Sequence, residues 1–193
     1  MRSQSLKALL DDIRACHICT GLPLGPKPIL QIESPKTRLL ITGQAPGTLA
    51  HESGITFNDP SGDRLREWLQ IDRETFYNKE LISIIPMGLC YPGRLEKGGD
   101  QPPRKECAPQ WREQLLRHLP DIQLTLLVGS YAQNYVLGKG KLTERVQNFR
   151  SYLPQFFPLP HPSWRTLAWA KKNPFFEQDV LVELRTLMKK ILY

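Results

Sequence analysis

Three short apolar segments constrain the fold of this chain more than any other feature of its sequence. They are rich in Leu, Ile and Val, each is followed by Gly or Pro, and they span residues 38–42, 81–85 and 124–128. Apolar runs of this length are typical of strands that are buried on both faces of a parallel sheet. A fourth segment, 155–159, contains Pro158 and is predicted at the edge of the sheet, because proline cannot donate a ladder hydrogen bond.

Helical patterns fill the gaps between the predicted strands. We expect helices over residues 3–15, 61–69 and 104–119, and a last helix with Asn173 as its cap and Pro174 in its first turn. The apolar residues of the last helix recur at helical spacing: Phe176, Val180, Leu184, Leu187 and Ile191. Alternating strands and helices predict a three-layer α/β/α fold, doubly wound around a central four-stranded parallel sheet.

Composition bounds the class of protein and its partners. A chain of 193 residues that is 40% hydrophobic, with no break in composition, predicts a single domain over residues 1–193. It has no signal-peptide core and no apolar window of about 18 residues, so we expect a cytoplasmic, monomeric protein with no membrane partner. The net charge of +7 favours a polyanionic partner such as DNA, because phosphate contacts release counterions.

The loops that follow the four predicted strands have unusual sequences. They read GQAPG (43–47), PMGLCYPG (86–93), GSYAQ (129–133) and PHPSWR (160–165). Ligands of doubly wound folds bind where loops leave the carboxyl ends of the strands, so we expect these loops to meet at one crevice. The first loop lacks both the Gly-Lys-Ser/Thr ending of a P-loop and the G-x-G-x-x-G fingerprint, so it matches neither nucleotide-binding pattern.

The four cysteines indicate a metal site. Cys16 and Cys19 form a C-x-x-C pair, and Cys90 and Cys107 follow much later in the chain. A reducing cytosol disfavours structural disulfides, so a tight pair and two further cysteines favour zinc or an iron–sulfur cluster. Four buried thiols without a metal are the alternative.

Two motifs and the cysteine spacing together match a known family. The first stretch follows the pattern G-E-A-P-G-x-x-E-D-x-x-G-x-P-F-V-G-x-A-G at Gly43, Ala45, Pro46, Gly47, Gly54, Phe57 and Gly62. The second motif, H-P-[SA], is His161-Pro162-Ser163. With these motifs the chain resembles the uracil-DNA glycosylase superfamily, most closely its iron–sulfur branch, family 4. The resemblance implies a 4Fe-4S cluster on Cys16, Cys19, Cys90 and Cys107, with structural zinc as the alternative.

The chain departs from the family pattern at a few positions. Gln44, Ala50 and His51 stand where the branch has acids, and Pro86 replaces an asparagine that reads the uracil edge. The leading hypothesis is a DNA glycosylase that hydrolyses the N-glycosidic bond of uracil or another deaminated base in base excision repair. A non-catalytic, iron–sulfur nucleic-acid binder with the same fold is the second hypothesis. An α/β enzyme that acts on a small nucleoside and carries a structural zinc is the third.

The first motif supplies the predicted base pocket. We expect the glycine at position 43 to let the backbone approach the base, Gln44 and Ala45 to bind a base carbonyl through their backbone N–H groups, and Phe57 to stack on the flipped base. A purely structural place in the core is the alternative for Phe57. His161 is predicted to donate a hydrogen bond to the base oxygen that becomes anionic.

An acidic residue is predicted to act on the attacking water. Asp59 is the nearest equivalent of the aspartate in the F-T-G-D-x-S-G motif of the related family 5, and Glu52 and His51 are weaker candidates. Asp-Pro-Ser-Gly is also an ordinary entry to a helix.

The residues after His161 are predicted to contact DNA. Ser163, Trp164 and Arg165 stand where the superfamily places a loop that probes the minor groove, and a bulky wedge with a cation suits a kinked backbone. Packing of Trp164 on the sheet, with Arg165 paired to an acid, is the alternative.

Overall fold

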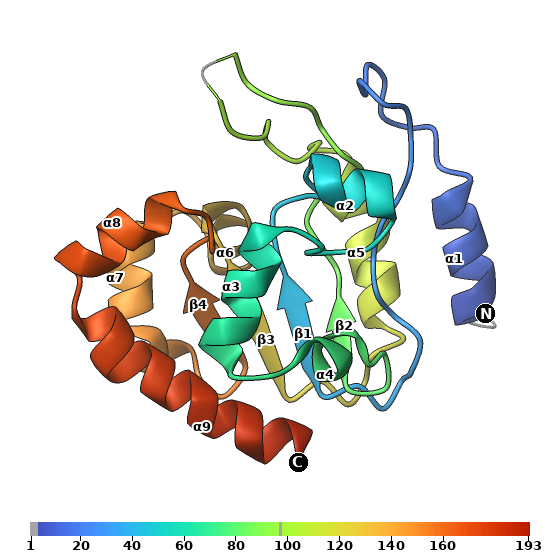
Figure 1. The fold of residues 1–193 in the computed structure, drawn as a ribbon. Coiled ribbons are helices and arrows are strands. Elements are labelled where there is room, and N and C mark those ends of the chain that lie inside the picture. The colour runs from blue at the N-terminus through green and yellow to red at the C-terminus, as the bar shows by residue number, and fades with distance from the viewer. Residues whose placement is uncertain (1–3, 97) are drawn as a thin grey trace.

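A four-stranded parallel sheet forms the centre of the protein in the computed structural model, which describes residues 4–96 and 98–193 (Figure 1). The strands are β1 (Leu39–Thr42), β2 (Ile82–Ile84), β3 (Leu124–Val128) and β4 (Phe156–Leu159). Their order is β2-β1-β3-β4, and every neighbouring pair is parallel. All four predicted strands are confirmed. β4 lies at the edge as predicted, with Pro158 opposite Leu127 of β3.

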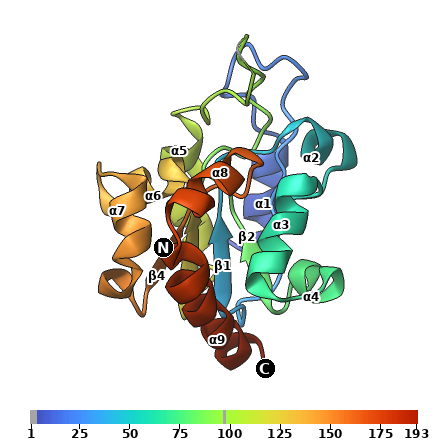
Figure 2. The same cartoon turned by 60° about the vertical axis from the view of Figure 1, so that its left-hand side comes forward.

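Helices cover both faces of the sheet, which confirms the three-layer α/β/α fold. One face, on which Leu40 and Leu127 point outward, packs against α1 (Leu6–Arg14), α5 (Cys107–Leu116) and α6 (Ser130–Leu137). The other face packs against α3 (Pro60–Leu69), α4 (Arg73–Tyr77), α7 (Leu142–Gln147) and α9 (Leu181–Leu192). Figures 1 and 2 show α3 on one side of the sheet and α5 on the other. Residues that alternate along each strand therefore pack into separate hydrophobic cores on the two faces of the sheet.

The last predicted helix differs from the observed one at its start. A π-helical segment, Phe176–Val180, precedes α9, and Asn173 is not its cap. Asn173 instead ends α8 (Arg165–Lys172), where its side-chain amide donates to the carbonyl of Trp169 at 2.8 Å. The prediction of Asn173 as an N-terminal cap was wrong because α8, a helix the sequence analysis did not identify, uses this residue as its own C-terminal cap.

Several short elements were not predicted from the sequence. They are α2 (Thr48–Ser53), α4, α6, α7, α8 and the 3-10 helix η1 (Phe149–Tyr152). Each has at most eight residues, which is too short for a helical period to stand out. None of the helices in the described ranges 4–96 and 98–193 is long and apolar enough to cross a membrane.

The turn into α3 is fixed by a close backbone contact. Phe57 has a left-handed conformation, with φ of 51°, which few residues other than glycine adopt. A Cβ atom on Gly62 would lie 1.7 Å from the carbonyl oxygen of Phe57, so only glycine fits there. Asp59 caps the helix, and its Oδ1 accepts a hydrogen bond from the Gly62 N–H at 2.8 Å. This turn fixes the places of both Phe57 and Asp59.

We expect the substitution Gly62→Ala to destabilise the protein by at least about 2 kcal/mol, because the added methyl group collides with rigid backbone. Alanine is otherwise the better helix former, so helix propensity alone predicts the opposite sign. Urea unfolding measures the free energy of unfolding. Gly47→Ala is the control, because its nearest neighbour would lie at an ordinary 3.4 Å. Equal stability of the two variants would contradict this account of the turn.

Candidate active site

The loops at the carboxyl ends of the strands enclose a solvent-open cleft of about 510 Å³. In Figure 1 this is the end of the sheet to which the strand arrows point. The loop after β1 lines the cleft with residues 43–47, the loop after β2 with Pro86, and the loop after β4 with His161. The predicted loop at 129–133 does not line it, because Gly129 packs beneath His161 and α6 begins at the next residue.

Phe57 forms one wall of the cleft. A Cβ atom on Gly43 would lie 3.0 Å from the Cζ atom of Phe57, so the ring rests against bare backbone. Its edge packs on Phe76, with ring centroids 6.3 Å apart at 87°. The ring is half-buried. Phe57 thus belongs both to the core, through Phe76, and to the cleft.

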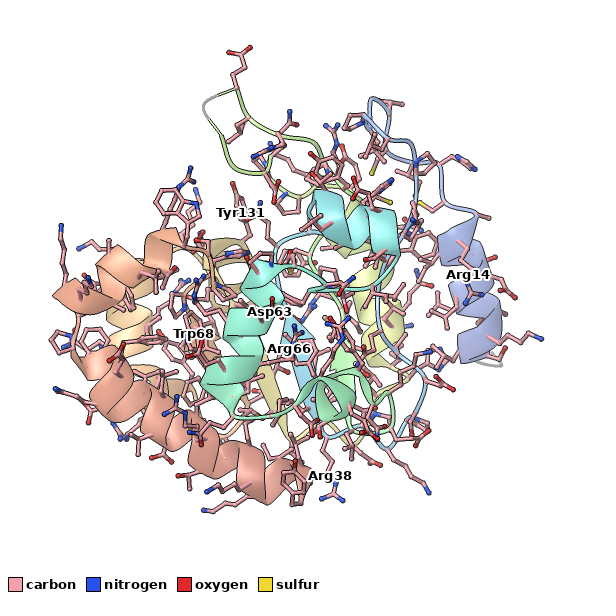
Figure 3. All side chains as sticks on the ribbon, viewed as in Figure 1. Arg14, Arg38, Asp63, Arg66, Trp68 and Tyr131 are labelled. Carbon is pink, nitrogen blue, oxygen red and sulfur yellow. The ribbon has the colours of Figure 1, made fainter. Side chains whose placement is uncertain are left out.

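A buried arginine supports this wall from below. The guanidinium of Arg66 lies over the rings of Phe76 and Tyr77, at 5.1 and 5.6 Å from their centroids. Its Nη2 atom lies 2.5 Å from Oδ1 of Asp63 on the same helix, and Figure 3 labels both residues on α3. Arg66 is 7% exposed, so its charge requires this partner. Phe76 is therefore held firmly under Phe57.

The backbone after β1 leaves two donors for a ligand. The carbonyls of Gly43 and Gln44 accept hydrogen bonds from Met87 and Gly88, at 3.0 and 2.9 Å, which extends the pairing of the two strands. Within the described residues, no hydrogen bond occupies the N–H of Gln44 or Ala45. The side chain of Gln44 has a different partner: its Nε2 donates to the carbonyl of Gln101 at 2.9 Å.

His161 lies at the cleft in a neutral state. Burial lowers the pKa of its imidazole, and the carboxylate of Asp59 raises it by a smaller amount. Its loop is fixed by Thr166, whose hydroxyl donates to the His161 carbonyl, and by Arg64, whose Nη1 donates to the carbonyl of Pro162 at 2.8 Å. A neutral imidazole can present one N–H to a ligand.

Two carboxylates meet at the cleft, those of Asp59, predicted from the sequence, and Asp100, which was not predicted. Measured from the position that a Cβ on Gly47 would take, Oδ2 of Asp100 lies 3.4 Å away and Oδ2 of Asp59 lies 3.8 Å away. Asp100 is exposed at the rim of the cleft; partial desolvation of its carboxyl raises its pKa, the nearby Arg94 lowers it, and the charge of Asp59 raises it further. Asp100 lies in a Gly-rich turn far from either motif, and only its acidity in the stretch GGDQPPR could have drawn attention to it.

Glu52 and His51, the two weaker candidates for the residue that acts on the attacking water, do not line the cleft. Glu52 is exposed on α2. His51 is buried on the same helix with its ring centroid 5.9 Å from that of Tyr91. The acid nearest to the cleft from the first motif is therefore Asp59.

A second groove adjoins the cleft and carries the residues predicted to contact DNA. Ser163 and Trp164 line it, together with Arg64 and Arg94. Trp164 is 71% exposed, which excludes its packing on the sheet, and the guanidinium of Arg165 lies 5.4 Å from its ring centroid. The groove thus combines Trp164 with two arginines, and Asp59 and Asp100 line both the groove and the cleft.

The four cysteines line one solvent-open cavity between the N-terminal segment and the start of α5. All four are free thiols. The N–H of Leu89 donates to Sγ of Cys107 at 3.3 Å, and burial raises the pKa of Cys107 to about 12. In the part of the chain that the structure describes, no three His, Cys, Asp or Glu side chains form a group that could hold a metal ion. The predicted ligands therefore share a cavity without converging on one point.

Comparison with known proteins identifies the family. A solution NMR structure from Methanosarcina acetivorans, provisionally named a uracil DNA glycosylase, aligns with 86% of this chain and 98% of its own at 15% identity and a TM-score of 0.47. A likeness of this size adds no functional information. The model of the uracil DNA glycosylase superfamily matches residues 30–185, a range that holds both motifs and the whole cleft. The chain therefore belongs to the uracil DNA glycosylase superfamily.

Proposed function

We propose that this protein is a DNA glycosylase that hydrolyses the N-glycosidic bond of uracil or another deaminated base in DNA. One observation carries the proposal: the ring of Phe57, the neutral imidazole of His161 and the carboxylate of Asp59 line the same cleft. Membership of the superfamily supports it. The cleft lies beside a groove that carries Arg64 and Arg94, in a protein of net charge +7, which suits a DNA substrate.

The cleft offers a site for a base that has left the helical stack. Flipping a nucleotide requires a few kcal/mol, and stacking on an aromatic ring returns about 1–3 kcal/mol. Phe57 provides that ring, and the N–H groups of Gln44 and Ala45 can donate to a base carbonyl. Trp164 and Arg64 in the adjoining groove suit a kinked backbone with its phosphates.

Bond cleavage develops positive charge on the sugar and negative charge on the base. The N–H of His161 donates to the base oxygen that becomes anionic, as a preorganised donor in a partly buried site. The carboxylate of Asp59 stabilises the cationic sugar and holds the attacking water. Its Oδ1 is fixed by the Gly62 N–H, so its direction is set before the substrate arrives.

The proposal includes a 4Fe-4S cluster held by Cys16, Cys19, Cys90 and Cys107. A tetrahedral zinc ion needs four sulfurs about 2.3 Å from one point. The resemblance of the cysteine spacing to the iron–sulfur branch supports the cluster, and the N–H of Leu89, which donates to Sγ of Cys107, suits a cluster sulfur. When bound, the cluster supplies a covalent link between the N-terminal segment and the segment after β2.

Base release from synthetic DNA tests the proposed activity. We expect the protein to create alkali-labile abasic sites in single-stranded or duplex oligonucleotides that hold uracil, hypoxanthine or xanthine, measured by gel electrophoresis after alkaline cleavage. His161→Ala should lower the rate by about 10²–10³-fold, because it removes a donor to the developing anion. His118→Ala, just beyond the end of α5, is the matched control with an unchanged rate. Binding without cleavage of any base would favour the non-catalytic hypothesis.

The role of Asp59 is tested by a substitution that keeps the helix cap. Asparagine caps a helix as well as aspartate does, so Asp59→Asn should preserve the free energy of unfolding while the rate of base release falls at least about tenfold. Asp59→Ala removes the cap and should reduce stability by about 1 kcal/mol as well. Urea unfolding and single-turnover rates separate the two effects. An unchanged rate in Asp59→Asn would rule out its action on the water.

The cofactor is tested by colour and by metal content. Protein purified without oxygen should be brown, absorb in the visible range, and contain iron and acid-labile sulfide. Cys16→Ala should lose both signals, whereas His17→Ala, an exposed neighbour, should keep them. A colourless protein with one equivalent of zinc would show that the structural-zinc alternative is correct.

A further inference from the structure

We propose that Asp100 is the general base of the reaction, and that its carboxylate takes a proton from the attacking water while Asp59 orients that water. This assignment rests on the glycosylase function proposed above. It concerns a residue outside both motifs, which the cleft brings into contact with the same space as Asp59 and His161.

The carboxylates of Asp59 and Asp100 differ in their hydrogen-bond partners. Both flank Gly47, at 3.4 Å for Asp100 and 3.8 Å for Asp59 from the position of an added Cβ. Oδ1 of Asp59 is occupied by the Gly62 N–H as the cap of α3. Within the described residues, no hydrogen bond or ion pair occupies either oxygen of Asp100. Both acids line the cleft and the adjoining groove, so this placement does not separate them. Their hydrogen bonds do: among the described residues only the carboxylate of Asp59 has a partner, which leaves both oxygens of Asp100 available for proton transfer.

The position of Asp100 is set by a small hairpin in which residues 93–95 pair with residues 99–101. The N–H of Gln101 donates to the carbonyl of Gly93 at 2.9 Å, which closes the hairpin at its base. The side chain of Gln44, at the end of β1, donates to the carbonyl of Gln101 at 2.9 Å. Gln44 stands where the family pattern has an acid, and here it acts as a positioning residue that ties Asp100 to the sheet.

The charged groups around Asp100 favour a carboxylate that can accept a proton over one that always stays ionised. Partial desolvation and the neighbouring Asp59 raise its pKa, and Arg94, its partner across the hairpin bridge, limits the rise. Arg64 faces it from the groove, and the imidazole across the cleft, His161, is neutral. A carboxylate with a raised pKa accepts and holds a transferred proton more readily than an ordinary aspartate does.

The step balances without any further reactant. The water oxygen bonds to C1′ of the deoxyribose as the bond from C1′ to the base nitrogen breaks, and that electron pair leaves with the base. The water proton moves to the Asp100 carboxylate and then passes to the solvent or to the released base. The products are a free base and an abasic sugar with a hydroxyl on C1′.

Single-turnover rates of base release from pH 4 to 9 test the assignment. Asp100→Asn should lower the rate about 100-fold or more, and the rise of the rate with pH on the acid side should disappear. The control is Glu96→Gln, an exposed acid on the same hairpin, which removes the same charge and should keep both the rate and the pH profile. Asp100→Asn should also keep its thermal midpoint at neutral pH, because the fold disfavours the charged form of this group.

Gln44→Ala provides a second variant that leaves Asp100 in place. It loosens the hairpin, so the rate should fall while the midpoint of the pH profile stays where it is in the wild type. A rate for Asp100→Asn within threefold of the wild type, or an unchanged acid limb, would overturn the role of Asp100 and leave the proposed function standing. A wild-type protein that releases no base from any oligonucleotide would overturn both.

Discussion

The contact between the Phe57 carbonyl and Gly62 is the constraint on which the site depends. It forces the chain through a left-handed turn at Phe57 and brings it into α3 at once. The ring of Phe57 is thereby laid against Gly43, and Asp59 is placed as the helix cap beside the cleft. Two glycines, one under the ring and one under the carbonyl, thus leave the space that a base pocket needs.

Charged side chains of both signs meet where the groove adjoins the cleft. Arg64 and Arg94 line the groove, where phosphates of a DNA strand would lie. Asp59 and Asp100 face the cleft, where a sugar that develops positive charge would lie. Arg94 also restrains the pKa of Asp100. A protein of net charge +7 thus carries two acidic side chains at its cleft.

The central sheet and the part of the cleft around Phe57 and His161 could be predicted from the sequence alone. The strands could be predicted because each is an uninterrupted apolar run, and Pro158 located the edge. The cleft residues near Phe57 and His161 could be predicted because local motifs carry them. Asp100 could not, because it reaches the cleft through a hairpin whose closing hydrogen bonds leave no periodic signal. Asn173 was misassigned for a related reason: the short helix α8, which ends there, has too few residues to stand out.

The hairpin also connects the cysteine cavity to the cleft. The connection from β2 to α5 leaves the sheet at Pro86, passes Cys90, carries Asp100 to the cleft and returns to the cavity at Cys107. Long connections without regular structure need ties to hold one conformation. Here the side chain of Gln44 donates to the carbonyl of Gln101 and holds the middle of the connection. The N–H of Leu89 donates to Sγ of Cys107 and holds its two ends together. A group that bound Cys90 and Cys107 together would strengthen the tie at the ends and so limit the freedom of Asp100. The cavity and the cleft are therefore best regarded as two ends of one structural unit.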